Sequence, residues 1–238
     1  SDEWIEDEED VVAEIEYTPE DIEAINAEII DLKKFRDLAQ KIRINSKAER
    51  LIVALEKAFV EIEKLGANQK ALIFTKSRRT QEFIYNLLEA RGYKNKVVQF
   101  NGSNTDAKSK EIYKNWLLEH KETDKITGSP TADKRAALVD YFKEEATIMI
   151  ATEAAAEGIN LQFCSLIVNF DLPWNPQRIE QRIGRCHRYG QKHDVVVVNF
   201  LNIKNAADQR VYELLDQKFQ LFDGVFGSSD EVLGAIGN

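Results

Sequence analysis

Residues 70–80 read KALIFTKSRRT, an apolar run that passes directly into a basic, hydroxyl-bearing loop. The run is continuous rather than alternating, which is typical of a strand buried on both faces of a parallel sheet. Four more such runs follow: KVVQF (96–100), TIMIAT (147–152), SLIVNFD (165–171) and VVVVNFL (195–201). Helical stretches lie between most of them. Strands that alternate with helices predict an α/β domain with a mainly parallel sheet and helices on both faces.

The helices are predicted from apolar periodicity and from residues that favour helix ends. Thr18 and Pro19 are typical of a helix start, and Ser46 is interpreted as the cap of a second helix that ends at Gly66. The remaining helices are expected at 77–91, 105–121, 131–144, 176–188 and 204–221.

The charge is divided unevenly along the 238 residues. The whole chain has a net charge of −9, but 14 of its 41 acidic residues lie in residues 1–32, which contain no Lys or Arg. The rest carries 27 acidic against 32 basic residues, a net charge of +5 that is compatible with nucleic acid. The predicted organisation is a disordered acidic leader (1–17), N-terminal helices (18–66), the α/β domain (67–222) with a helical insertion at about 103–127, and a tail (223–238).

Composition also excludes several classes of protein. No apolar run approaches the roughly 18 residues that a membrane span needs, so no membrane partner is expected. The two cysteines form no disulfide framework, which favours a reduced, cytoplasmic setting. The only methionine is Met149 and none stands at position 1, so the sequence is interpreted as a piece of a longer protein.

The loops at the carboxyl ends of the predicted strands favour phosphate, but the usual catalytic motifs are absent. Ligands bind at this edge in open α/β sheets, and several of these loops carry Ser, Thr, Gly or Arg at a helix start. No G-x-x-x-x-G-K-[ST] loop, G-x-G-x-x-G loop or G-x-S-x-G elbow occurs. The histidines and cysteines lack metal-ligand spacing, so no metal site is expected.

The stretch NPQRIEQRIGRCHRYGQ (175–191) contains four arginines and no lysine. A helix over 177–188 would place Gln181, Arg185 and Arg188 on one side, and Ile179, Ile183 and Cys186 on the other. The second side can pack on a core. The first would then present planar guanidinium groups, which suit phosphate or carboxylate.

These residues also resemble a known family. W-N-P from Trp174 followed by the 181–191 pattern resembles motif VI of the Swi/Snf family of superfamily-two helicase-like ATPases. ATEAAAEGINLQ (151–162) resembles its motif V, and ALIFTKSRRT (71–80) its motif IV. The resemblance runs in family order from about residue 46 to 222. It implies the second RecA-like domain of a bacterial member, half of an ATP-dependent DNA translocase.

The resemblance implies roles in ATP hydrolysis. In the family, ATP with magnesium lies mainly on a first RecA-like domain, which carries the P-loop, so no cofactor is expected on this chain alone. Arg185 and Arg188 match the arginine fingers, and Gln181 matches the glutamine at the phosphate edge. Gly158 and Asn160 match the part of motif V that approaches the nucleotide. The implied protein partner is that first RecA-like domain.

The resemblance also implies contacts to a nucleic-acid backbone, expected to be double-stranded DNA. The matching residues are Lys76, Ser77, Arg78, Ser129 and Thr152. Small hydroxyls and amides at helix starts can bind phosphates without reading sequence. The competing interpretation is that Ser77 is an ordinary helix cap and that the two basic side chains are surface charges.

Some positions do not follow the family pattern. Arg178 and Arg182 match no fixed position of motif VI, and Glu153 stands where many members have arginine. Two Gly-Ser pairs, at 102–103 and 128–129, compete for one family position. Two alternative functions also stay open: a non-catalytic nucleic-acid-binding or regulatory module, and an unrelated phosphate-binding enzyme.

Overall fold

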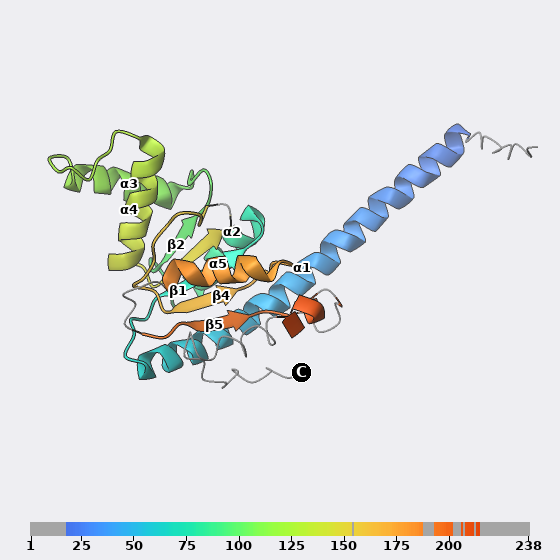
Figure 1. The fold of residues 1–238 in the computed structure, drawn as a ribbon. Coiled ribbons are helices and arrows are strands. Elements are labelled where there is room, and N and C mark those ends of the chain that lie inside the picture. The colour runs from blue at the N-terminus through green and yellow to red at the C-terminus, as the bar shows by residue number, and fades with distance from the viewer. Residues whose placement is uncertain are drawn as a thin grey trace, which may run out of the picture. The chain divides into compact units, whose positions relative to one another are not determined.

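The computed structural model describes residues 18–153, 155–187, 193–201, 206, 208–211 and 213–214, with the side chains of all but 39–45. Among these residues, parallel strands form one sheet in the order β2-β3-β1-β4-β5 (Figure 1). The strands are β1 (Ala71–Thr75), β2 (Val97–Phe100), β3 (Ile148–Thr152), β4 (Leu166–Asn169) and β5 (Val196–Asn199). Each lies inside one of the apolar runs, so the predicted parallel sheet is confirmed.

Helices connect the strands as the periodicity indicated. They are α1 (Pro19–Lys64), α2 (Arg78–Ala90), α3 (Ala107–Glu119), α4 (Pro130–Glu144) and α5 (Pro176–Cys186). The helix predicted at 204–221 is described only in part, and those residues are helical. The predicted leader (1–17) and tail (223–238) lie outside the described residues.

The prediction of two helices before the first strand was wrong, because α1 passes through Ser46 without a break. No glycine or proline lies within α1 after Pro19. A serine inside a helix costs only about half a kcal/mol relative to alanine, so Ser46 does not force a stop. The helix ends at Lys64, and the predicted glycine stop, Gly66, lies in the turn that follows. Gly66 has a φ of 71°, and the next amide, of Ala67, donates to the carbonyl of Ile62 in a glycine-type C-cap.

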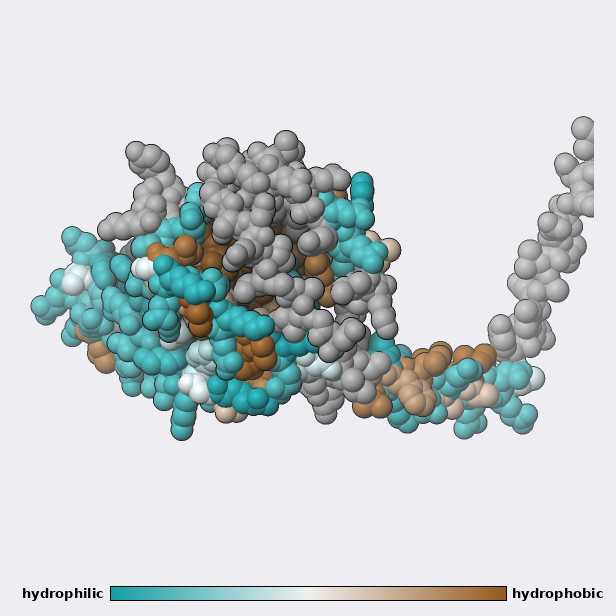
Figure 2. Space-filling view, turned by 90° about the horizontal axis from the view of Figure 1, so that it is seen from below, coloured by the Kyte–Doolittle hydropathy of each residue, from teal (hydrophilic) through white to brown (hydrophobic). Residues whose placement is uncertain are grey.

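The chain divides into two compact units, Ser1–Asn45 and Ser46–Asn238. In the first unit the described side chains of α1 are exposed, and brown apolar atoms run along this stretch in Figure 2. The exposed apolar residues there are Ile22, Ile25, Ile29, Ile30, Leu32, Phe35 and Leu38. The sheet and the helices that cover it belong to the second unit.

The central strand β1 contributes side chains to two separate hydrophobic cores, because successive side chains of a strand point to opposite faces of the sheet. Leu72 and Phe74 pack with apolar residues of α3, α4 and α5 on one face. Ala71 and Ile73 pack with α2 and the C-terminal part of α1 on the other. All five residues of β1 are buried, which explains why its sequence is continuously apolar.

Candidate functional site

The carboxyl ends of β3, β1 and β4 lie side by side in the middle of the sheet. Thr75 of β1 is in register with Thr152 of β3, and Phe74 of β1 is in register with Asn169 of β4. The loop at 76–78 therefore leaves the sheet next to Thr152. The structure brings together four of the predicted nucleic-acid residues at the edge where open α/β sheets bind ligands.

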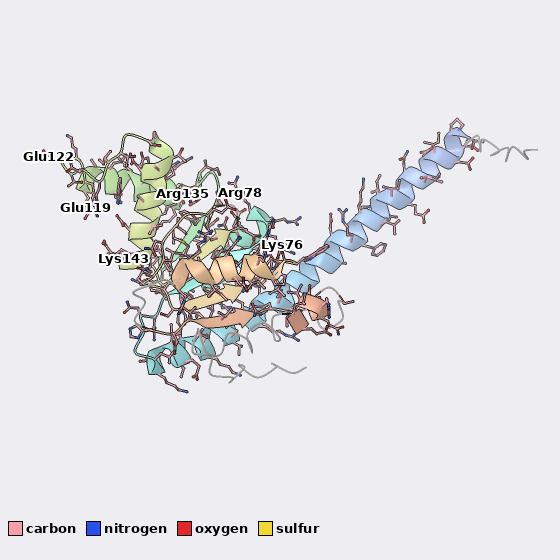
Figure 3. The ribbon with its side chains drawn as sticks, viewed as in Figure 1. Lys76, Arg78, Glu119, Glu122, Arg135 and Lys143 are labelled. Carbon is pink, nitrogen blue, oxygen red and sulfur yellow. The ribbon has the colours of Figure 1, made fainter. Side chains whose placement is uncertain are left out.

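The loop after β1 combines a helix cap with exposed basic side chains. Ser77 caps α2, with its Oγ accepting from the amide of Thr80 at 3.0 Å. The amide of Lys76 donates to Asp171 Oδ2 at 2.9 Å, which fixes the loop on the end of β4. The side chains of Lys76 and Arg78 are exposed (Figure 3). The cap role considered for Ser77 is therefore present, and the two cations remain accessible.

The start of α4 is organised by a buried carboxylate. Asp133 Oδ1 accepts from the amide and hydroxyl of Thr127 at 2.9 and 2.7 Å, and Oδ2 accepts from the amide of Gly128 at 3.2 Å. These bonds, led by the Thr127 hydroxyl, lower the pKa of Asp133. The N-cap residue Ser129 makes no side-chain cap hydrogen bond and is exposed. Its hydroxyl thus stands at a helix start, where anions are favoured.

The other Gly-Ser pair, at 102–103, is tied into a polar network. The amide and hydroxyl of Ser103 both donate to Asn101 Oδ1 at 3.2 Å. Asn101 Nδ2 in turn donates to Gln81 Oε1 at 3.0 Å, and Gln81 is buried. This serine holds its own loop together. Ser129 is therefore the better match to the family's phosphate-binding serine.

The helix α5 has the two-sided character that its sequence predicted. Asn175 caps it, with Oδ1 accepting from the amide of Gln177 at 2.9 Å. The predicted apolar side is buried and comprises Ile179, Ile183 and Cys186. On the other side Gln181 is exposed and Arg185 is half-buried.

Arg182 of α5 is buried, with only 3% of its side chain exposed. Its Nη1 donates to Asn169 Oδ1 at 2.7 Å and to the carbonyl oxygen of Asp171 at 3.0 Å. Its Nη2 donates to Glu153 Oε2 at 3.3 Å. The guanidinium also lies over the Phe74 ring, 4.6 Å from the centroid. One side chain therefore ties α5 to the ends of three strands.

From the sequence, Arg182 was expected to affect stability more than chemistry, but its partners were not identified, although one pattern indicates them. At 100° per residue, Arg182 lies within about 60° of Ile179, on the edge of the apolar side of α5. An arginine at such a position needs a buried partner, and Glu153 was the acidic departure from the family pattern. Burial lowers the pKa of Arg182, while Glu153 acts in the opposite direction. Arginine is effectively always protonated in proteins, so the guanidinium stays charged.

The loop after β3 contacts α5 through the residue that follows Asn160. The amide of Leu161 donates to the carbonyl oxygen of Arg185 at 2.9 Å, so the two predicted nucleotide-side segments are in direct contact. Gly158 has a φ of 78° and open space where a Cβ would lie. Position 158 therefore requires glycine because of its left-handed backbone conformation, and not because another atom of the described residues lies close to it.

Arg135 of α4 is a second residue that the sequence did not identify. Its Nη2 donates to the carbonyl oxygen of Glu157 at 2.8 Å, and its guanidinium lies 5.1 Å from the Phe100 ring centroid. Arg135 thus holds the peptide that precedes Gly158. Because α4 begins at Ser129, this contact links the predicted nucleic-acid side to the predicted nucleotide side.

Some predicted features lie outside the described residues. The second predicted arginine finger, Arg188, is one of them, as are Gly190 and Gln191 of the same motif. Within the described part of the chain, no group of three His, Cys, Asp or Glu side chains is placed to hold a metal ion. No described helix has the length and apolar character required to cross a bilayer.

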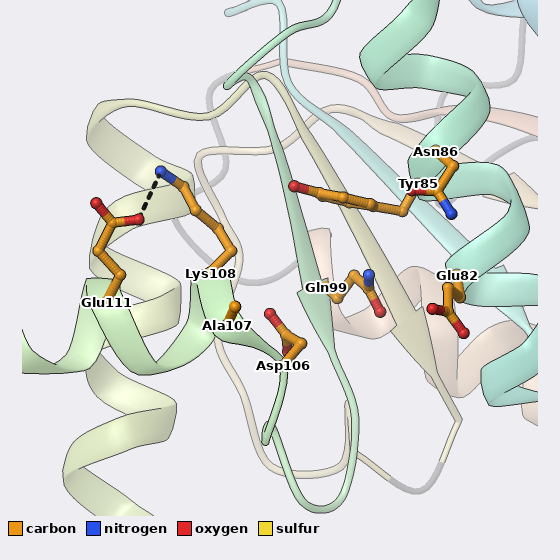
Figure 4. Close-up of a pocket in the computed structure, with 8 residues that line it drawn as sticks. All are labelled: Glu82, Tyr85, Asn86, Gln99, Asp106, Ala107, Lys108 and Glu111. Atoms are coloured by element: carbon orange, nitrogen blue, oxygen red, sulfur yellow. Dashed lines mark hydrogen bonds and ion pairs between the residues drawn. The ribbon is translucent and has the colours of Figure 1, made fainter.

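A polar hollow of about 390 Å³ lies apart from these residues, between α2, β2 and α3 (Figure 4). It is lined by the carboxylates of Glu82, Asp106 and Glu111, and by Lys108, whose ammonium lies 3.5 Å from Glu111. None of the predicted site residues lines it. Its acidic lining does not suit phosphate, so the candidate site is the strand edge and α5.

Comparison with known proteins finds similar helicases. Residues 81–190 match the helicase conserved C-terminal domain. The uncharacterized ATP-dependent helicase YqhH of Bacillus subtilis (strain 168) is 40% identical over 143 residues, covering 59% of this chain and 25% of that protein. The RNA polymerase-associated protein RapA of Pseudomonas aeruginosa (strain LESB58) is 39% identical over 93 residues, covering 38% of this chain and 9% of RapA.

The chain thus spans a quarter or less of the length of these two relatives. A solved structure, the C-terminal part of the Fun30 ATPase domain, aligns with a TM-score of 0.48 at 20% identity, over 70% of this chain and 44% of that one. The family match begins in α2 and extends past α5, so it includes the Ser129 loop, the loop after β3 and Arg185. Residues 81–190, which lie on a parallel sheet with helices on both faces, are thus similar to the helicase conserved C-terminal domain.

Proposed function

We propose that this chain is the C-terminal half of an ATP-driven DNA translocase of the Swi/Snf type. It supplies Arg185 of α5, and Arg188 of the same sequence motif, to ATP bound on a first RecA-like domain, and its strand edge binds the DNA backbone. The observation that carries the proposal is the asymmetry of α5. Its apolar side is fixed in the core and Arg182 is held at three strand ends, while Arg185 remains half-exposed.

This asymmetry suits phosphoryl transfer. Charge on the transferring phosphoryl group is best met by a cation that is already held in place. Within the described residues the guanidinium of Arg185 has no hydrogen bond or ion pair, so it is available to a phosphate. The fixed helix beneath it limits its movement. Gln181 on the same side and Asn160, next to the Leu161 that contacts α5, complete the proposed phosphate edge.

The residues of this domain fit the phosphate end of ATP but not its metal. Bound ATP with magnesium supplies the phosphoryl group and the Lewis acid, and both need a P-loop and carboxylates. No such loop occurs in the 238 residues, and no metal-binding group occurs in the described part of the chain. We therefore assign magnesium and the triphosphate cradle to the first RecA-like domain.

The proposed DNA contacts use charge and hydroxyl groups without base recognition. Lys76 and Arg78 are exposed cations at the start of α2, and Ser129 is an exposed hydroxyl at the start of α4. Thr152 lies beside Thr75 at the end of β3. Such groups bind the phosphates of DNA whatever its base sequence, and a motor that moves along DNA requires this. The proposal places the protein in the cytoplasm, in keeping with its buried, free thiols Cys164 and Cys186.

The isolated 238-residue chain is expected to hydrolyse ATP no faster than a buffer blank. The physical reason is that it contains no loop able to cradle a triphosphate. Phosphate release should be measured for the purified chain with and without a DNA duplex. Steady turnover that survives repurification would contradict the assignment of the chain to the second half of a motor.

DNA binding by the same chain should be weak, independent of sequence and sensitive to salt. Lys76→Gln and Arg78→Gln are each expected to reduce the slope of log affinity against log salt by about 1, because each removes one phosphate contact. Fluorescence anisotropy with a labelled mixed-sequence duplex over a salt series measures this slope.

The matched control for DNA binding is Lys143→Gln. Lys143 is an exposed lysine of α4, about 20 Å along the helix from Ser129 and close to the opposite edge of the sheet. Figure 3 shows it well away from Lys76 and Arg78. An equal change of slope in this variant, or a strong preference for one DNA sequence, would refute the proposed binding edge.

A further inference from the structure

Glu153 occupies the junction between the proposed DNA edge and α5. It directly follows Thr152, the last residue of β3, and 28% of its side chain is exposed. Its Oε2 lies 3.2 Å from Arg178 Nη1 and 3.3 Å from Arg182 Nη2. A single carboxylate oxygen is thus shared by two arginines that lie one turn apart on α5.

The two arginines are held differently. Arg182 is buried and is also fixed by Asn169 and Asp171, whereas 57% of the Arg178 side chain is exposed. The Nε of Arg182 is buried without a hydrogen-bond partner within the described structure. Its charge therefore depends strongly on the carboxylate of Glu153, because a buried cation without an anion is unfavourable.

Movement of α5 at Arg182 is transmitted to Arg185. The two residues are three positions apart on one hydrogen-bonded helix, so they share a rigid element and lie almost one turn from each other. Small errors in the position of a catalytic group are costly, and about 1 Å can lower a rate on the order of a hundredfold. Whatever sets the position of α5 therefore sets the activity of Arg185.

We propose that Glu153 is a positioning residue that couples DNA binding at Thr152 to the alignment of Arg185. This inference rests on the proposed function. A phosphate bound at Thr152 lies beside the carboxylate of Glu153 and repels it. The repulsion drives the carboxylate toward Arg178 and Arg182, strengthens both ion pairs and draws α5 onto the end of β3. Through Glu153, DNA binding therefore moves α5, the helix that carries Arg185, toward the end of β3.

The test uses Glu153→Gln in the intact parent protein, because glutamine keeps the size of the side chain and removes its charge. We expect the DNA-stimulated kcat to fall about tenfold, as for a catalytic group displaced by a fraction of 1 Å. ATP turnover without DNA should fall less than the DNA-stimulated turnover, and KM for ATP should change less than about twofold. Affinity for a mixed-sequence duplex should rise rather than fall, because the charge that repels the bound phosphate is gone.

A second readout does not depend on activity. Amide hydrogen exchange of the peptide at 176–187 should slow when duplex DNA is added to the wild-type parent, since the strengthened ion pairs hold α5. The same peptide in Glu153→Gln should show no response to DNA. The matched control is Glu157→Gln, an exposed glutamate of the same loop, which should behave as wild type in both measurements.

Two results would overturn the coupling role. One is a Glu153→Gln protein whose DNA stimulation and exchange response equal those of Glu157→Gln. The other is a loss of turnover that is matched by an equal loss without DNA and by a fall in melting temperature, which indicates a structural role alone. Arg185→Lys, measured in parallel, tests the proposed function separately: normal turnover in that variant would refute the arginine finger, whatever Glu153→Gln does.

Discussion

ATP turnover by the intact parent protein is expected to fall about a thousandfold when Arg185 is replaced by lysine, the usual effect of losing an arginine finger. Lysine keeps the charge, but it lacks the planar fork that meets two phosphate oxygens at once. DNA affinity and melting temperature should stay close to wild type, because the Arg185 side chain is half-exposed and makes no hydrogen bond or ion pair in the described structure. Steady-state ATP hydrolysis with saturating DNA measures the effect.

The matched control for this experiment is Arg91→Lys. Arg91 is an exposed arginine at the end of α2, paired with Glu49 at 2.7 Å, and its replacement should leave turnover unchanged. Arg188→Lys should lose as much turnover as Arg185→Lys, on the basis of the sequence motif alone. Full activity in both finger variants would favour the alternative function, a regulatory module that keeps the helicase fold without driving hydrolysis.

The second large effect is on stability. We expect Arg182→Ala to lower the free energy of unfolding by about 3–5 kcal/mol, the usual result of removing one partner of a buried ion pair. The substitution leaves Asn169 Oδ1 without its donor and opens space over the Phe74 ring. For a domain of this size the melting temperature should fall by roughly 10 °C. Thermal and urea unfolding of the 238-residue chain measure both quantities.

Arg178→Ala is the control for stability. Arg178 lies on the same helix and shares the Glu153 carboxylate, but its side chain is 57% exposed. Exposed ion pairs contribute about 0–1 kcal/mol, so this variant should unfold within about 1 kcal/mol of wild type. If both variants lose the same stability, the buried position of Arg182 is not what makes it important.

Much of the fold could be predicted because its elements have strong local patterns. Five continuous apolar runs became the five strands, since a parallel strand covered on both faces leaves no position for alternation. Helix ends were predictable where the local chemistry is decisive, as at Ser77 and Gly66. The prediction failed at Ser46, where a serine that resembles a cap lies inside α1. Cap residues only permit a helix to start, and nothing in the sequence stopped the preceding one.

The sequence by itself determined the α/β class, the two sides of α5 and the arginine that faces away from the core, because these follow from residue type and helical or strand periodicity. The tertiary structure alone decided that Arg182 is buried and bound to Glu153, which is 29 positions away in the sequence, and that the amide of Leu161 donates to the carbonyl oxygen of Arg185. It also distinguished Ser129, which makes no side-chain cap hydrogen bond, from Ser103, whose hydroxyl donates to Asn101. The physical reason is that ion pairs and hydrogen bonds between distant segments depend on strand order and register, which bring together the ends of β3, β1 and β4, and no local pattern encodes that neighbourhood.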